Sequence, residues 1–197
     1  MAFKEKVLED LGSFLPEKAF LLNEEATLRQ AGGLHTEEPV NAKLIVRPKS
    51  TEEVSKILAI CNREKQPVVV HGGLTGLVYG TRTLPDQLIL SLERMNEIDE
   101  VDVVGRTLTC QSGATLQNIQ EKAEKQEMIF PLDLGARGSC SIGGNISTNA
   151  GGSEVLKYGM TKNFIEGLKV VLPNGKVLNS IKEIKKDNRG FDPKYLH

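Results

Sequence analysis

Two glycine-rich stretches hold the residues whose types and spacing suit the binding of a polar ligand. The first, Gly72-Gly73-Leu74-Thr75-Gly76, follows the apolar run at residues 67–70 after a single residue, His71. The second, residues 131–152, alternates glycine with serine, threonine and asparagine and carries little charge. Glycine permits a positive φ and leaves neighbouring N–H groups accessible, so consecutive amides in such a loop can point at phosphate oxygens.

The first stretch differs from the common nucleotide motifs. After its G-G-x-x-G spacing the chain continues through Gly80 and Pro85, a segment that predicts no helix. The dinucleotide fingerprint of doubly wound folds needs a helix N-terminus at this point. The Gly-Lys-Ser/Thr of a nucleotide P-loop is also missing. A phosphate-binding loop and a purely structural loop at a strand end both fit the spacing.

The second stretch predicts a long, ordered loop that binds a ligand. Long loops without secondary structure in a compact domain are usually functional or disordered. Ile142 and Ile146 are spaced like anchors, and segments typical of ordered strands follow. Amides and short polar side chains suit a large polar ligand that carries an apolar ring. Two such loops from two lobes would grip one extended molecule.

Hydrophobic patterning predicts the elements that position these loops. Ser50 and Glu53 form a capping-box pattern ahead of apolar residues at helical spacing, which predicts a helix over residues 51–64. Residues 42–48 and 67–70 predict flanking strands, and the unbroken valines of the second predict burial on both faces. This β-α-β order favours two parallel strands.

The rest of the chain predicts a second set of strands and one more helix. Thr115 caps this helix, and the Pro-Asn-Gly at residues 173–175 marks a hairpin turn. The expected strands cover residues 87–92, 96–104, 106–112, 163–172 and 175–180, and the inward side chains of the helix are Leu116, Ile119 and Ala123. We therefore expect an α+β fold with a helical extension at residues 1–39 and two lobes at residues 40–98 and 99–197.

Composition narrows the classes of function. The formal net charge of −1 and the absence of tryptophan argue against a nucleic-acid-binding surface. The longest apolar runs are much shorter than the roughly 18 residues that a membrane span needs. Cys61, Cys110 and Cys140 show neither metal-binding spacing nor an even disulfide count. These features predict a cytoplasmic protein without a metal site.

At the level of whole motifs, the chain resembles a known family. The stretches PVVVHGGLTGL, FPLDLGARGSCSIGGNISTNAGG and KYGMTKNFIEGLKVVLPNGKVL stand in family order between residues 40 and 197. They are similar to the FAD-linked oxidases whose FAD domain is of the p-cresol-methylhydroxylase type. The strongest similarity is to the branch of D-2-hydroxyglutarate, D-lactate and glycolate dehydrogenases. The resemblance implies the two-lobed α+β FAD-binding domain of that family.

The resemblance also implies a set of residues that bind FAD. The first loop would bind the pyrophosphate, the second would run along the flavin, and Val170 would lie against the adenine. The implied residues are His71, Gly72, Gly73, Leu74, Thr75, Gly76, Pro131, Leu132, Asp133, Gly138, Ser139, Cys140, Gly143, Gly144, Asn145, Asn149, Gly151 and Val170. Within this set, we expect His71 to hydrogen-bond its loop and Cys140 to be a packing residue.

Attachment of the cofactor is expected to be non-covalent. Some family members bind FAD covalently through a histidine directly after the Gly-Gly pair, and here that position is Leu74. The family's substrate-binding cap, with its catalytic base and metal-binding histidines, has no counterpart in this sequence, so no catalytic residue is assigned. The resemblance thus implies a C-terminally incomplete FAD domain of a D-2-hydroxyacid dehydrogenase, inactive alone. A subunit that joins a cap-bearing or iron–sulfur partner, a non-catalytic flavin-binding module and a purely structural domain remain the alternatives.

Overall fold

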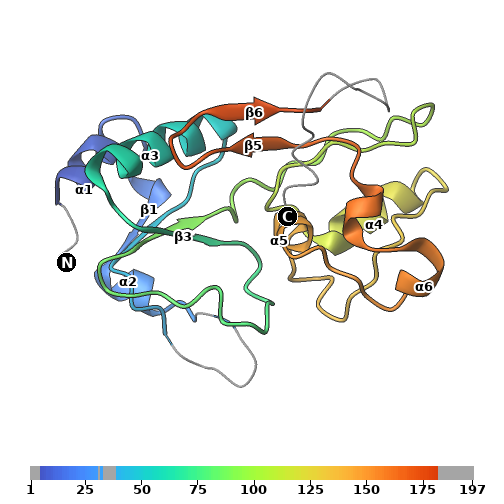
Figure 1. Cartoon of the computed structure of the whole chain (residues 1–197), viewed down its shortest axis with the longest axis horizontal. Coiled ribbons are helices and arrows are strands. Elements are labelled where there is room, and N and C mark those ends of the chain that lie inside the picture. Colours follow the sequence, from blue (N-terminus) through green and yellow to red (C-terminus); the bar gives the residue numbers. More distant parts are fainter. Residues whose placement is uncertain (1–4, 31, 33–38, 182–197) are drawn as a thin grey trace.

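The computed structural model describes residues 5–30, 32 and 39–181, and within them it contains a four-stranded and a two-stranded sheet (Figure 1). The larger sheet has the order β1-β2-β4-β3, in which β2, β3 and β4 are parallel and β1 is antiparallel. The strands are β1 (Phe20–Leu22), β2 (Leu44–Val46), β3 (Val68–His71) and β4 (Leu88–Ser91).

Both central strands of this sheet are buried on two faces. Leu44, Val46, Leu88 and Leu90 belong to the cluster beneath α1 (Glu5–Gly12) and α3 (Thr51–Glu64). Ile45 and Ile89 belong to a cluster on the other face, with Ala26, Val40 and Ala42. Ala26 lies on the short helix α2 (Asn23–Thr27). Because side chains alternate along a strand, β2 and β4 supply both clusters.

The helix between the first two parallel strands forms as its sequence predicts. The Ser50 hydroxyl accepts the N–H of Glu53 at 3.2 Å, which caps α3. The Glu53 carboxylate accepts the N–H of Lys49 at 2.7 Å, one residue before the cap. The Ser50 bond leaves one fewer unpaired N–H group at the start of the helix, and the Glu53 bond goes to Lys49 instead of the N-cap residue itself.

The prediction that residues 67–70 form a strand buried on both faces is wrong. β3 is the edge strand of the sheet, and Val70 is 52% exposed. The strand at the centre is β4, which pairs with both β2 and β3. The β-α-β unit is parallel as expected, but a strand later in the sequence lies between its two strands.

The N-terminal segment is more than the expected run of helices and connectors. After α1 and a 3-10 helix, η1 (Glu17–Ala19), it contributes β1, which pairs with β2. Residues 182–197 of the expected second lobe lie outside the described residues. The proposed lobe boundaries stay predictions.

The second part of the molecule is built mainly on helices and irregular backbone. The predicted helix is present as α4 (Leu116–Glu124), with the Thr115 hydroxyl accepting the Asn118 N–H at 3.3 Å. The two strands expected in residues 96–112 appear only as isolated bridges, Ile98–Cys110 and Asp102–Thr107. Three short elements follow α4: α5 (Ile142–Ser147), α6 (Val155–Tyr158) and the 3-10 helix η2 (Thr161–Phe164).

A hairpin late in the sequence returns to the first part of the molecule. Its strands, β5 (Lys169–Val171) and β6 (Val177–Asn179), are antiparallel and enclose the predicted Pro-Asn-Gly turn, where Gly175 has a φ of 83°. The Ser55 hydroxyl on α3 donates to the Gly175 carbonyl at 2.6 Å. The hairpin thereby lies along α3 (Figure 1). Among the described residues, no helix is long and apolar enough to cross a membrane.

Candidate functional site

The carboxyl ends of the three parallel strands meet at one edge of the larger sheet. In the ladder, Val46 pairs with Leu90, and His71 pairs with Ser91. The loop Gly72–Gly76 therefore begins beside the residues that follow β4. Ligands of open parallel sheets bind outside such carboxyl ends, so this edge is the candidate site.

His71 closes β3 and supports the loop that follows it. Its Nε2 lies 2.9 Å from the Thr81 carbonyl oxygen, and because a carbonyl can only accept, Nε2 carries the proton. Burial, followed by the nearby charge of Arg29, lowers the pKa of His71 below its ordinary value despite the hydrogen bond to Thr81. This neutral, buried imidazole fits the expected role of hydrogen-bonding the loop.

The first glycine loop keeps a row of backbone donors without partners. Within the described part of the chain, the N–H groups of Leu74, Thr75 and Gly76 have no hydrogen-bond acceptor. Leu74 has a φ of 58°, a left-handed conformation that non-glycine residues seldom adopt. An added Cβ at Gly76 would have no atom within 4 Å, so open space lies beside that residue.

The two glycine-rich stretches touch each other directly. A Cβ at Gly73 would overlap the carbonyl oxygen of Ser139, and a Cβ at Gly72 would overlap the hydroxyl of Ser141. The Gly73 N–H donates to that hydroxyl at 3.3 Å. At these two positions glycine is required by the neighbouring protein backbone and side chain rather than by a ligand.

Part of the second stretch is a helix, which corrects the expectation of a continuous loop. α5 begins after Ser141, whose hydroxyl accepts the Gly144 N–H at 3.3 Å. The Ile142 N–H donates to the Ala114 carbonyl at 2.9 Å, and the Gly143 N–H to the Ser112 carbonyl at 2.8 Å. The amides of Gly143 and Gly144, both implied to bind FAD, are therefore already bonded within the protein.

Two further glycines allow close contact between the start of α5, residues 112–113 and the residues after β4. A Cβ at Gly113 would overlap the Leu92 carbonyl oxygen, and the Gly113 N–H donates to the Met95 carbonyl at 2.7 Å. A Cβ at Gly143 would meet Ser112 at 2.7 Å. The backbone thus runs in close contact from β4 through residues 112–113 and 139–143 back to the loop after β3.

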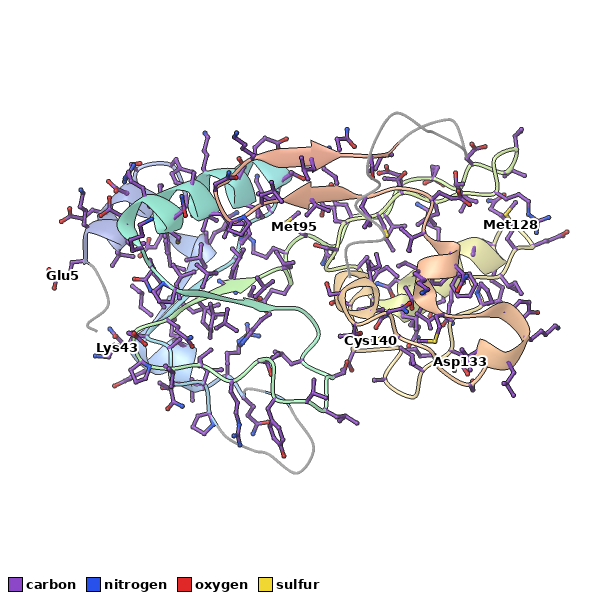
Figure 2. All side chains as sticks on the ribbon, viewed as in Figure 1. Glu5, Lys43, Met95, Met128, Asp133 and Cys140 are labelled. Atoms are coloured by element: carbon purple, nitrogen blue, oxygen red, sulfur yellow. The ribbon has the colours of Figure 1, made fainter. Side chains whose placement is uncertain are left out.

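The start of the second stretch lies on the core of the second part of the molecule. Leu132 is fully buried in a cluster with Leu116 and Cys140, and its carbonyl accepts the side-chain N–H of Gln120 at 2.7 Å. Asp133 accepts from the Ser153 hydroxyl at 3.0 Å, and its other carboxylate oxygen lies 3.6 Å from Arg137. Asp133 and Cys140 both lie in this part (Figure 2).

Asn145 and Asn149 are held by local contacts. Asn145 is buried and donates weakly to the Cys140 sulfur at 3.5 Å, consistent with a packing role for that thiol. Asn149 has a φ of 46° and accepts the Lys162 N–H at 3.1 Å through its side chain. Val170 is separate from these residues, within β5 of the hairpin on α3.

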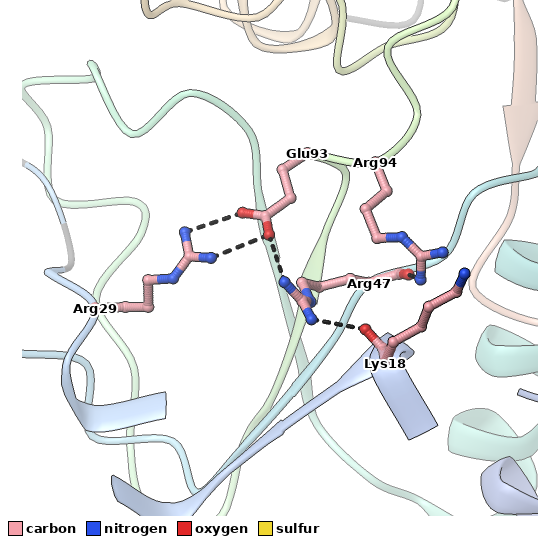
Figure 3. Close-up of polar contacts among 5 residues, drawn as sticks. All are labelled: Lys18, Arg29, Arg47, Glu93 and Arg94. Atoms are coloured by element: carbon pink, nitrogen blue, oxygen red, sulfur yellow. Dashed lines mark hydrogen bonds and ion pairs between the residues drawn. The ribbon is translucent and has the colours of Figure 1, made fainter. Parts of the chain in front are cut away.

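A charged cluster beside the same sheet edge is missing from the residues implied by sequence. The Glu93 carboxylate accepts two hydrogen bonds from Arg29 at 3.0 Å each and one from Arg47 at 3.2 Å (Figure 3). Arg47 also donates to the Lys18 carbonyl at 2.6 Å, and Arg94 donates to the Arg47 carbonyl at 2.9 Å. No local pattern joins these residues, so only the folded chain reveals the cluster.

A cavity of about 530 Å³ borders the second glycine-rich stretch, but no residue of the first glycine loop lines it. Its apolar lining includes Leu108, Cys110, Ile142, Ile146 and Phe164. None of the residues implied for the cofactor lines this cavity. The candidate site is therefore the region at the carboxyl ends of the parallel strands, with the amides of Leu74, Thr75 and Gly76, rather than this cavity.

Comparisons with known proteins identify the family of this chain. The model of a family described as "FAD binding domain" matches residues 42–180. The mitochondrial D-2-hydroxyglutarate dehydrogenase of Danio rerio is 47% identical over 156 residues, which cover 79% of this chain and 29% of the relative. The D-2-hydroxyglutarate–pyruvate transhydrogenase of Saccharomyces cerevisiae is 38% identical over 188 residues, covering 95% of this chain and 36% of the relative. The chain thus spans about a third of the length of these relatives.

Solved structures share the fold at low identity. An alkyldihydroxyacetonephosphate synthase superposes with a TM-score of 0.84 at 19% identity, over 100% of this chain and 41% of the other. The 6-hydroxy-D-nicotine oxidase of Arthrobacter nicotinovorans superposes with a TM-score of 0.67 at 21% identity, over 81% and 35%. These matches confirm the expected α+β fold of the p-cresol-methylhydroxylase-type FAD-binding domain. Since the family match at residues 42–180 extends over most of the chain, this protein belongs to the FAD binding domain family.

Proposed function

We propose that this chain is the FAD-binding part of a flavin-dependent D-2-hydroxyacid dehydrogenase. The observation that carries the proposal is the row of unpartnered N–H groups at Leu74, Thr75 and Gly76, at the carboxyl edge of a parallel sheet. The names of the relatives support the class of substrate, because they include D-2-hydroxyglutarate and D-lactate dehydrogenases.

The donors at this edge fit a pyrophosphate. Three successive amides and the Thr75 hydroxyl offer hydrogen bonds without any competing acceptor among the described residues. The open space beside Gly76 lets phosphate oxygens approach this backbone. Oriented amides of this kind stabilise anions through their fixed partial charges.

The second stretch, residues 131–152, would bind the flavin part of the cofactor. Gly135 and Gly138 are exposed, and an added Cβ at Gly135 would have no atom within 4 Å. The Leu132 side chain is buried in the core, so this position would meet a flavin only through its backbone. Asp133, held by Ser153 and Arg137, would present a fixed polar group beside the ring.

We propose that FAD is bound non-covalently. Leu74, directly after the Gly-Gly pair, has an alkyl side chain that offers no nucleophile to the flavin ring. Precipitation with acid should release all of the yellow colour into the supernatant. Flavin that stays with the precipitated protein would contradict the non-covalent attachment.

Bound FAD supplies an acceptor at its N5 atom for the hydride that leaves C2 of the hydroxyacid. The residues of this chain bind and orient the cofactor in this scheme. His71 is engaged with Thr81 and buried, so it is not placed to remove the hydroxyl proton of a substrate. We therefore expect this chain alone to reduce no dye with D-2-hydroxyglutarate or D-lactate.

The test is reconstitution of the purified chain with FAD. A shifted and structured flavin absorbance band, with saturable quenching of flavin fluorescence, is the expected result. An unchanged spectrum at a large excess of protein would contradict the function. The cytoplasmic location and a partner subunit, such as that of a glycolate or D-lactate oxidase, stay predictions.

A further inference from the structure

One buried hydroxyl lies where the two glycine-rich stretches meet. Ser141 is 5% exposed, and its oxygen accepts two N–H groups, from Gly73 at 3.3 Å and from Gly144 at 3.3 Å. The second bond caps α5, and the first crosses to the loop after β3. A single atom therefore belongs both to a helix cap and to the connection between the stretches.

The bond from Gly73 is the last backbone hydrogen bond before the free donors. The next three residues, Leu74, Thr75 and Gly76, have no backbone N–H bond within the described residues. The direction of these free amides therefore depends on how Gly73 is held. Close contact of Gly73 with the backbone of Ser139 limits its position, but the hydroxyl of Ser141 is the group that orients its N–H.

We propose that Ser141 is a positioning residue for the phosphate-binding loop. By accepting the Gly73 N–H, its hydroxyl orients the amides of Leu74, Thr75 and Gly76 before the cofactor arrives. Preorganised donors bind more tightly because the loop loses less freedom on binding. This inference rests on the proposed function, since the ligand of these amides is the FAD pyrophosphate.

The burial of Ser141 favours a role within the protein over a direct contact with a ligand. At 5% exposure, the hydroxyl has both of its acceptor positions directed at protein N–H groups. A purely structural role as the cap of α5 is the remaining alternative. The two roles can be separated because glycine replaces serine at a helix cap at little cost but has no oxygen to bind Gly73.

The decisive variant is Ser141→Gly, with Thr115→Gly as its matched control. Thr115 caps α4 through the same kind of bond, at 3.3 Å to the Asn118 N–H. Its backbone forms a bridge with that of Ser141, but no hydrogen bond among the described residues joins its side chain to the first glycine loop. We expect Ser141→Gly to weaken FAD binding about five- to tenfold, the loss typical of one hydrogen bond. Thr115→Gly should change the FAD dissociation constant less than about twofold.

Fluorescence titration with FAD and chemical unfolding of the cofactor-free protein supply the two measurements. Weaker binding in Ser141→Gly, with a loss of stability no larger than that of Thr115→Gly, supports the positioning role. Equal FAD affinities for the two variants would overturn it. Ser141→Cys, whose sulfur is a weak acceptor of similar shape, provides a second variant if Ser141→Gly fails to fold.

A second readout needs no cofactor. Hydrogen exchange of the Gly73 amide should be several-fold faster in Ser141→Gly than in the wild type, and unchanged in Thr115→Gly. If the wild type binds no FAD, the proposed function is wrong, and the exchange comparison still decides whether Ser141 holds the loop. Unchanged exchange in Ser141→Gly would overturn the inference even if FAD binds.

Discussion

The amide of Gly73 donates to the hydroxyl of Ser141 at 3.3 Å, although 68 residues separate them in the sequence. This contact joins the loop after β3 to the cap of α5. It shows that the glycines of the two stretches serve two different purposes. Those at the contact let protein segments approach each other, and Gly76 leaves room for a ligand.

The first prediction separates these purposes at Gly73 and Gly76. In Gly73→Ala, the new methyl group would overlap the Ser139 carbonyl and lie 2.8 Å from the Cys140 Cα. We expect a loss of about 2 kcal/mol in the free energy of unfolding, as for other overpacked sites. In Gly76→Ala, the new methyl group has no atom within 4 Å. This substitution should change the free energy of unfolding by less than about 0.5 kcal/mol. Equal losses in urea unfolding would contradict this difference.

The second prediction concerns the cluster around Glu93. Glu93→Ala leaves Arg29 and Arg47 without their carboxylate partner at a half-buried position. We expect the free energy of unfolding to fall by about 2 kcal/mol, since removing one partner leaves the other charges unpaired. Glu100→Ala is the control, because Glu100 pairs with Lys122 while 90% exposed and should change it by less than about 1 kcal/mol. A neutral Glu93→Ala variant would show that the cluster adds no stability.

The third prediction follows from the pKa of the same carboxylate. Burial acts to raise the pKa of Glu93, but the hydrogen bonds and charges of Arg29 and Arg47 outweigh it and lower that pKa. Because the pKa is lower in the folded than in the unfolded state, the carboxylate stabilises the fold above the unfolded value, and this contribution is lost as the pH falls through the folded value. The stability difference between wild type and Glu93→Gln should be constant above about pH 5 and shrink below about pH 4. Urea unfolding at several pH values measures it, and a difference that grows on acidification would contradict the sign.

The fourth prediction concerns the thiols. Burial raises the pKa of Cys61 to about 11, and burial together with the charge of Asp99 raises the pKa of Cys110 to about 11. Cys140 is 2% exposed. Because the thiolate is the reactive form, a thiol reagent at pH 8 should modify the folded protein slowly and all three cysteines rapidly in denaturant. Rapid modification of the folded protein would contradict the raised thiol pKa values of Cys61 and Cys110 and the burial of Cys61 and Cys140.

Local features of the sequence were sufficient for several elements. Ser50 and Glu53 predict the start of α3 because capping needs only residues within one turn. The Pro-Asn-Gly turn predicts the β5–β6 hairpin for the same reason. The glycine pair after a strand, together with the family motifs, predicts both the FAD-binding fold and the position of the first loop at a strand end.

Features that depend on distant partners were not predictable in this way. The valines of β3 fit an edge strand as well as a central one, and the place of β4 in the sheet decided between them. Glycine is a poor helix former, so the residues of α5 predicted a loop. Contacts of its first amides with Ala114 and Ser112 stabilise the helix instead.

The sequence by itself determined the family and the fold class, and it predicted which two stretches face the cofactor, because these follow from local pattern and motif. Only the tertiary structure decided which glycine amides remain free. The amides of Gly73, Gly143 and Gly144 are bonded to protein groups, whereas those of residues 74–76 have no acceptor among the described residues. The physical reason is that a hydrogen-bond donor is available to a ligand only if no other segment of the folded chain has supplied its acceptor.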